Sequence, residues 1–266
     1  RRTAPSPVRE VADAAGVPVL TPTSLRDPQI VQTIMDLAPQ CCPVVAYGNL
    51  VPAPLLDLPE HGWVNLHFSL LPAWRGAAPV QHAIIAGDRT TGASVFRLDA
   101  GLDTGPVLAS TAEPIRPEDT AGDLLARLAE IGADLLLATL DSIAAGAATA
   151  TAQPADGASL APKLLVEDAH VQWSDPAVAI DRLIRGCSPA PGAWTTFRGE
   201  RVKLDRVQLV DGENDSAAGD NPPLGPGERC VATYSLPTSR RGVHHVGPLT
   251  STVQDPFGLV RRARTD

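Results

Sequence analysis

The sequence predicts an α/β protein of two domains, and three features of the chain support this prediction. Strand-like and helix-like stretches alternate up to about residue 146, which is the pattern of an open α/β sheet. A low-complexity stretch rich in Ala, Thr and Gly follows, and hairpin-like segments with little helix come after it. We therefore expect an α/β domain over residues 1–146, a linker over 147–165 and a small β-domain over 166–266.

The first predicted elements form half of a βαβ unit. Val8 to Ala15 has helical spacing, Gly16 ends that helix, and Val17 to Leu20 follows as a short strand. Because a βαβ unit begins with a strand, we expect that a first βα unit is missing before Arg1.

The following elements continue the alternation. Ser24 or Asp27 can cap a helix that runs to Leu37. The apolar run Cys42–Ala46 suits a parallel strand that is buried on both faces. Further along, the chain predicts a short helix at 55–58, a strand at 63–68, a helix at 78–87, an antiparallel or edge strand at 92–98, a strand at 107–113 and a long amphipathic helix at 120–146.

The second domain is predicted from shorter patterns. A helix at 176–186 precedes two strand-like segments, 193–198 and 201–209, which meet across Gly199-Glu200 as a hairpin. Residues 211–227 are rich in Pro and Gly and are expected to form a loop. From about residue 228 the sequence shows neither helical nor strand periodicity, so the end of this domain stays unassigned.

Composition excludes several functional classes. The net charge of -8 argues against a general nucleic-acid binder, although it allows a local basic face. No apolar run is long enough to span a membrane and no signal peptide is recognisable, so we expect a cytoplasmic protein without a membrane partner. The four Cys lack paired zinc-ligand spacing, and His244-His245 lacks a third ligand, so no metal is expected.

The candidate catalytic residues lie in the stretch from Trp63 to Pro106. Asn65 and His67 interrupt an apolar strand two residues apart, so both side chains point to one face. An amide and an imidazole side by side can polarise a carbonyl and move a proton. Asp103 follows in Leu-Asp-Thr-Gly-Pro, and if this loop returns to the strand, Asp103 can orient or charge His67.

Each residue also has a purely structural interpretation. A single strand His is more often a structural residue than a catalyst, and an Asp before Thr-Gly-Pro is more often a turn former. The joint pattern favours the catalytic interpretation. It consists of Asn-x-His, then Ser-Leu-Leu-Pro at 69–72, then Arg75-Gly76 and Pro79, and finally Leu-Asp-Thr-Gly at 102–105.

This pattern resembles the folate-dependent formyltransferases. The resemblance covers roughly Pro5 to Gly227 and implies a Rossmann-like formyltransferase domain followed by an OB-like β-barrel. It assigns catalysis to Asn65, His67 and Asp103, in which Asp103 favours the imidazolium form of His67. It also implies 10-formyltetrahydrofolate as the co-substrate and a pterin site built largely of backbone groups. The implied folate-binding residues are Leu50, Val51, Ser69, Leu70, Leu71 and Pro72.

The acceptor is inferred from the same resemblance. Residues 77–84 and 161–164 look most like the branch of the family that formylates initiator methionyl-tRNA for translation initiation. Two alternatives remain open: a formyltransferase for an amino sugar nucleotide, and an inactive remnant that binds folate. We expect a monomer. The residues expected to contact tRNA are Arg1, Arg2, Lys163, Arg198 and Lys203.

Overall fold

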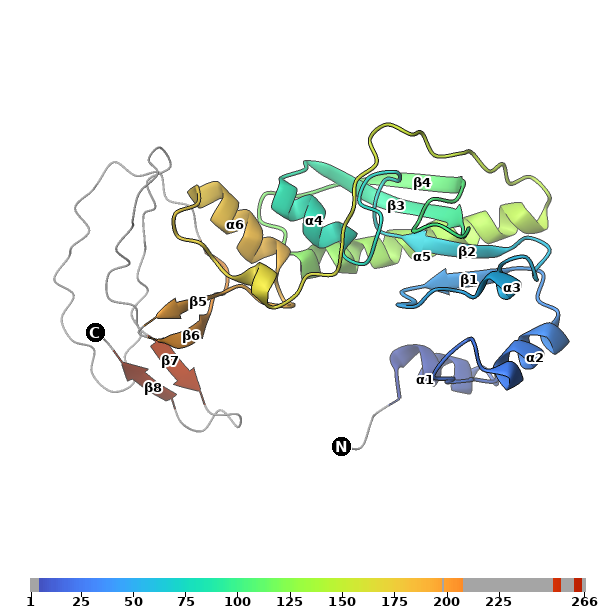
Figure 1. Cartoon of the computed structure of the whole chain (residues 1–266), viewed down its shortest axis with the longest axis horizontal. Coiled ribbons are helices and arrows are strands. Elements are labelled where there is room, and N and C mark those ends of the chain that lie inside the picture. The colour runs from blue at the N-terminus through green and yellow to red at the C-terminus, as the bar shows by residue number, and fades with distance from the viewer. Residues whose placement is uncertain (1–4, 198, 208–250, 255–260, 265–266) are drawn as a thin grey trace.

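The computed structural model describes residues 5–197, 199–207, 251–254 and 261–264. Figure 1 shows a sheet with the long helix α5 behind it, and a second group of elements beyond α4. The elements are α1 (Pro7–Ala14), α2 (Pro28–Leu37), β1 (Cys42–Val45), α3 (Ala53–Leu56), β2 (Trp63–His67), α4 (Pro79–Ala86), β3 (Thr90–Arg97), β4 (Val107–Pro114), α5 (Ala121–Ala144), η1 (Glu167–Ala169), α6 (Ala177–Gly186), β5 (Trp194–Phe197), β6 (Glu200–Lys203), β7 (Ser251–Gln254) and β8 (Arg261–Arg264).

The larger sheet is mixed and has the strand order β1-β2-β3-β4. β1 pairs in parallel with β2, and Val44 lies opposite Asn65. β3 runs antiparallel to β2, so that His67 lies opposite Ser94. The carboxyl ends of β1 and β2 therefore share one edge of the sheet, the place where open α/β sheets bind ligands.

The two faces of β2 have different neighbours because side chains alternate along a strand. Val64 and Leu66 pack with Leu136 and Ile143 of α5. Trp63, on the opposite face, packs with Val44 and Leu55. Asn65 and His67 belong to this second face, away from α5. Helix α5 begins where the sequence indicates, since Thr120 and Asp123 form a capping box there.

Of three strand predictions, one was wrong, one was wrong in part and one is confirmed. Val17–Leu20 forms no strand, and Val17 and Leu20 are about half exposed. Cys42–Ala46 does pair in parallel, but β1 is an edge of the sheet in the described part of the chain, and Val45 is 54% exposed. The 92–98 segment is confirmed as an antiparallel strand, since β3 pairs antiparallel with both β2 and β4. Sequence periodicity reports which face is apolar, but it does not report where a strand sits in the sheet.

The C-terminal elements have their own core. Ala169, Val171, Ile180 and Ile184 pack together beside the β5–β6 hairpin, where Gly199 takes a left-handed φ of 81° at the turn. β5–β6 and β7–β8 form separate two-stranded sheets in the described residues, so the OB-like barrel stays a prediction. The expected 211–227 loop and His244-His245 lie outside the described residues.

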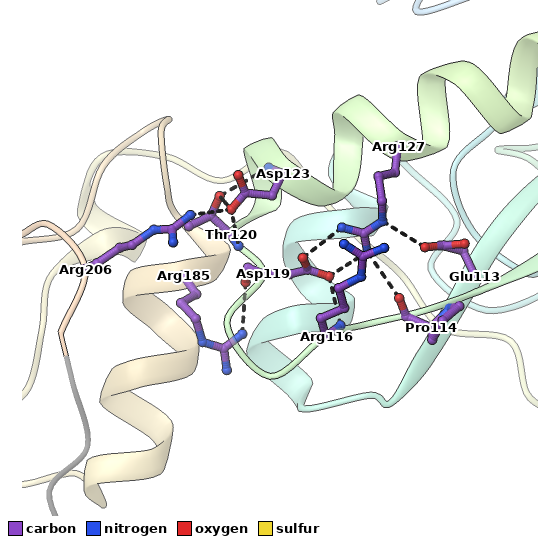
Figure 2. A network of polar contacts seen from close by, with 9 residues as sticks. All are labelled: Glu113, Pro114, Arg116, Asp119, Thr120, Asp123, Arg127, Arg185 and Arg206. Atoms are coloured by element: carbon purple, nitrogen blue, oxygen red, sulfur yellow. Dashed lines mark hydrogen bonds and ion pairs between the residues drawn. The ribbon is translucent and has the colours of Figure 1, made fainter.

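A polar network joins this part to the α/β domain (Figure 2). Arg127 on α5 donates to both carboxylate oxygens of Asp119, at 2.8 and 2.6 Å, and to Glu113 at 2.8 Å. Arg185 on α6 donates to the backbone oxygen of Asp119 at 3.1 Å. Arg206, which follows β6, bonds the Asp123 carboxylate at 2.6 Å. The start of α5 is thus one contact between the two parts, and Ile85 of α4, which packs against the C-terminal core, provides another.

No helix in the described ranges is both long enough and apolar enough to cross a membrane.

Candidate active site

The structure brings the three predicted catalytic residues together. Asn65 and His67 lie on one face of β2, and Asp103 reaches His67 from the loop that connects β3 to β4. His67 Nδ1 lies 3.8 Å from Asp103 Oδ2, and both side chains are largely buried. We call Asn65, His67 and Asp103 the catalytic trio.

The Asp103 loop is held by its backbone. Asp103 has a left-handed φ of 51°, a conformation that Asp tolerates better than most residues. Its Oδ2 accepts a hydrogen bond of 2.7 Å from the Gly76 backbone N–H. At Gly105 a Cβ would come within 1.8 Å of the Arg97 carbonyl oxygen, so only glycine fits. These constraints explain the Asp-Thr-Gly-Pro sequence of the loop.

A backbone carbonyl defines the tautomer of neutral His67. His67 Nε2 lies 2.9 Å from the Trp74 carbonyl oxygen. Because a carbonyl oxygen can only accept, Nε2 carries the proton, and Nδ1 of neutral His67 has a free lone pair. That lone pair is on the nitrogen nearer to Asp103, so Nδ1 is the atom able to take a proton from a substrate.

Burial lowers the pKa of His67. Loss of hydration is the largest effect and disfavours the charged ring, while the Asp103 carboxylate and the Trp74 carbonyl act in the opposite direction without reversing the shift. The expectation that Asp103 favours the imidazolium is therefore right about the direction of its own effect, but the effect of burial is larger. His67 is neutral at pH 7 and suited to act as a base.

This pKa shift predicts the acid limb of the pH profile. The ordinary His pKa is 6.5, so with a lowered pKa we expect the midpoint of the acid limb of kcat to lie below pH 6.5. Asp103→Asn removes the charge that raises the pKa of His67, and the limb should move further toward acid pH. A kcat profile between pH 5 and 8 measures both effects, and a limb at or above pH 6.5 would contradict the assignment.

Asn65 supplies a free hydrogen-bond donor. It is half-buried, it lies between Val44 and Phe96 in the sheet, and its side-chain amide makes no hydrogen bond to any residue that the structure describes. His67 lies edge-on to Phe96, with the ring centres 6.3 Å apart. An amide that has no hydrogen-bond partner and lies beside a base and an aromatic ring is suited to stabilise a developing oxyanion.

The predicted folate-binding segments lie at the shared edge of β1 and β2. Ser69 to Pro72 follows β2, while Leu50 and Val51 follow β1, and Leu50 is 72% exposed. Direct binding of folate by these residues stays a proposal.

Ser94 is a site residue that the sequence did not indicate. Its buried hydroxyl donates to the Ser69 carbonyl oxygen at 2.7 Å and accepts from the Leu71 backbone N–H at 3.2 Å. It thereby holds the Ser-Leu-Leu-Pro turn against β3. Only the β2–β3 register reveals this role, since Ser94 lies opposite His67.

The structure describes two of the five predicted tRNA-binding residues, Lys163 and Lys203. Lys163 precedes η1 and Lys203 ends β6, and both are exposed. Arg1, Arg2 and Arg198 lie outside the described residues. In the described ranges no three His, Cys, Asp or Glu residues gather as metal ligands. Hollows of about 460 and 780 Å³ lie against α1, lined by residues between Pro5 and Thr21, and neither includes the trio.

Comparison with known proteins identifies the family. Residues 1–140 match the formyl transferase family model, and residues 163–235 match the model of the formyl transferase C-terminal domain. A methionyl-tRNA formyltransferase of Salinispora tropica is 60% identical over 226 residues, which cover 85% of this chain and 71% of that protein. That of Streptomyces avermitilis is 58% identical over 219 residues, 82% of this chain and 71% of the relative.

The chain belongs to the formyl transferase family, among the methionyl-tRNA formyltransferases. The fold agrees with this membership. HypX from Aquifex aeolicus, whose structure is a complex with tetrahydrofolic acid, matches 68% of this chain and 32% of its own with a TM-score of 0.59 and 20% identity. At that identity the likeness shows the fold alone. The Rossmann-like formyltransferase domain and the presence of a C-terminal domain are thereby confirmed.

Proposed function

We propose that this formyltransferase moves the formyl group of 10-formyltetrahydrofolate to the amino group of methionine on initiator tRNA. One observation carries the proposal: a neutral His67 with its free Nδ1 facing Asp103, beside the unengaged amide of Asn65. Formyl transfer to an amine needs a base and an oxyanion donor, and it needs no Ser or Cys nucleophile. The methionyl-tRNA formyltransferase relatives support the acceptor.

Each residue of the trio has a role in the transfer. His67 Nδ1 takes a proton as the amine nitrogen bonds to the formyl carbon, and Asn65 donates its side-chain N–H to the oxygen that gains negative charge. The nearby Asp103 carboxylate stabilises the imidazolium that forms. His67 then returns the proton to the folate nitrogen, as the bond between that nitrogen and the formyl carbon breaks. The products are an N-formyl amide and tetrahydrofolate, and no proton is left over.

The surroundings of the trio fit a folate. A pterin is flat and largely apolar on its faces, and its edge needs hydrogen-bonding groups. Exposed apolar side chains are available at Leu50 and Leu102, which are 72% and 53% exposed. The Ser69–Pro72 turn adds backbone groups at the same edge of the sheet. We propose that Leu50, Val51 and residues 69–72 hold the pterin against Asn65.

Among the acceptors, the amino sugar nucleotide is not favoured, because the relatives of 58–60% identity are methionyl-tRNA formyltransferases. The decisive experiment offers 10-formyltetrahydrofolate with charged initiator tRNA in one reaction and with an amino sugar nucleotide in another. We expect formyl transfer to the tRNA only. Transfer to the sugar nucleotide alone would contradict the proposed acceptor, and transfer to neither would favour an inactive folate binder.

Lys163 and Lys203 are proposed to contact tRNA phosphates. A protein that neutralises phosphates with cations loses affinity steeply as salt rises. We expect the slope of log Kd against log salt to fall by about one unit for each of Lys163→Ala and Lys203→Ala. Titrations of tRNA binding at salt concentrations from 50 to 200 mM, roughly a fourfold range, would measure this slope. Arg26→Ala is the control, because Arg26 is exposed and lies before α2. Equal slopes in all variants would contradict the proposed contact of Lys163 and Lys203 with tRNA phosphates.

The remaining assignments are also proposals. They are the division at 1–146, 147–165 and 166–266, closure of the last part as an OB-like barrel, action as a monomer, and a cytoplasmic location. The two-part core and the β5–β6 hairpin support the first two. Sedimentation at micromolar concentration would test the third.

A further inference from the structure

The stretch between the two family matches is bound to the active site. We name residues 151–161 the strap; Figure 1 shows the chain here running from the end of α5 back past the strands to η1. Thr151 and Val107 exchange two backbone hydrogen bonds of 2.8 Å, and Leu160 forms a parallel bridge with Arg75. A low-complexity sequence predicts a free linker, but these contacts place the strap on the α/β domain.

Gln153 bonds both loops of the active site. Its Nε2 donates to the Asp103 carbonyl oxygen at 2.9 Å and to the Gly105 carbonyl oxygen at 2.7 Å. Its Oε1 accepts from Arg75 Nη2 at 2.6 Å and from Arg75 Nε at 3.1 Å. The amide therefore uses both of its donor hydrogens and its acceptor at once. No other residue type of this length offers that combination.

The other end of the strap holds the segment that binds His67. Ser159 Oγ accepts from the Trp74 backbone N–H at 2.8 Å, and the Ser159 carbonyl accepts from the Arg75 N–H at 2.9 Å. Trp74 is the residue whose carbonyl oxygen accepts the hydrogen bond from His67 Nε2. At Gly76 a Cβ would lie 2.6 Å from the Ala161 carbonyl oxygen, so the strap and this loop are in close contact.

We infer that the strap is part of the active site and that Gln153 is a positioning residue for the reaction. Asp103 and Trp74 contact His67 from separate loops, and the strap ties these loops to each other through Gln153, Arg75 and Ser159. A displacement of about 1 Å in such a constellation can lower turnover by about 10²-fold. Gln153 contacts the backbone carbonyl of Asp103 and not its carboxylate, so its effect acts through the position of Asp103.

Two substitutions separate the contacts of Gln153. Gln153→Glu keeps an acceptor for Arg75 but cannot donate to the carbonyl oxygens of Asp103 and Gly105, which it also repels. Gln153→Met keeps the length and removes every hydrogen bond. Gln172→Met is the matched control, because Gln172 is exposed and its side chain bonds only that of His170 among the described residues.

The test measures kcat and both KM values for formyl transfer to methionyl-tRNA with the full-length protein, and so it rests on the proposed function. We expect kcat to fall by about 10- to 100-fold in Gln153→Glu and Gln153→Met. Each KM should stay within about threefold, because ground-state binding is untouched. Melting temperatures, measured in parallel, should change little, and Gln172→Met should match the unsubstituted protein.

The outcomes are separable. Unchanged kcat in Gln153→Glu would overturn the inference, since the contact to the Asp103 loop would then be dispensable. A loss of activity that merely follows a loss of folded protein would also overturn it. An unsubstituted protein that formylates no tRNA would instead contradict the proposed function, independently of Gln153.

Discussion

Replacing His67 by alanine is expected to lower kcat by about 10²–10⁴-fold, the contribution of a positioned general base. Asn65→Ala should lower it by about 10²–10³-fold, because the developing oxyanion loses a side-chain donor. Neither change removes a large apolar contact, so both proteins should fold. Single-turnover formyl transfer at saturating substrate measures the effect on the chemical step.

His61→Ala provides the control for these substitutions. His61 lies in the turn before β2, and its contact to Gln40 uses only the backbone. Its replacement should leave kcat unchanged. Near-normal turnover in His67→Ala or Asn65→Ala would show that the trio does not carry the reaction.

The largest expected effect on stability comes from Arg127. Its guanidinium is paired with Asp119 and Glu113, whose side chains are 6% and 13% exposed. Burial alone would raise the pKa of Asp119, but the hydrogen bonds from Arg127 and from the Arg116 backbone outweigh it, so that the pKa is lowered. Arg127→Met leaves the buried Asp119 and the partly buried Glu113 without their cation and should reduce the free energy of unfolding by about 3 kcal/mol.

A pair of companion variants isolates the cause. Adding Asp119→Asn to Arg127→Met removes one of the unpaired charges and should recover part of the lost stability. Arg9→Met is the matched control, because Arg9 and Asp13 form an exposed pair with side chains 44% and 55% accessible. Urea unfolding at pH 7 measures all of them. An equal change for Arg9→Met and Arg127→Met would contradict the role of burial.

Acid should weaken the same contact. Because the pKa of Asp119 is below its ordinary 3.8 in the folded protein, its pairing stabilises the fold above that pH and is lost as the pH falls through the folded pKa. His67 also makes the folded protein less stable as the pH falls, but for a different reason. With a lowered pKa, it is protonated more readily in the unfolded chain once the pH drops below 6.5, and stability therefore declines.

Much of the site could be predicted because its signals are local. The two-residue spacing of Asn65 and His67 follows from strand geometry, and the helical spacing of residues 121–144 gives α5 nearly to its ends. The return of Asp103 has no such signal. β3 is antiparallel to β2 and ends beside Val64, so the loop has to fold back from there to reach His67. The family resemblance, and not periodicity, indicated that contact.

Other parts depend on tertiary structure alone. Ser94 acquires its role from strand register, and Gln153 acquires its role from a segment whose composition is typical of a flexible connection. The protonation state of His67 depends mainly on its burial. The effect of burial on its pKa is larger than that of the neighbouring Asp103 charge, which the sequence does show. An edge position such as that of β1 depends on how many strands pair, which no single strand encodes.

The close contact between Gly76 and Ala161 has a consequence for how the two domains can be recombined. Ala161 is fully buried, and its carbonyl oxygen accepts the N–H of Ala78 at the start of α4. A chimera that takes its C-terminal domain from another formyltransferase keeps this packing only when the junction lies beyond Ala161. With a junction at residue 147, where the composition changes, the strap would come from the other protein together with its C-terminal domain. The Asp103 loop would then lose its own partner, Gln153. The safe point of exchange therefore lies after the strap, in the exposed Pro162-Lys163 segment.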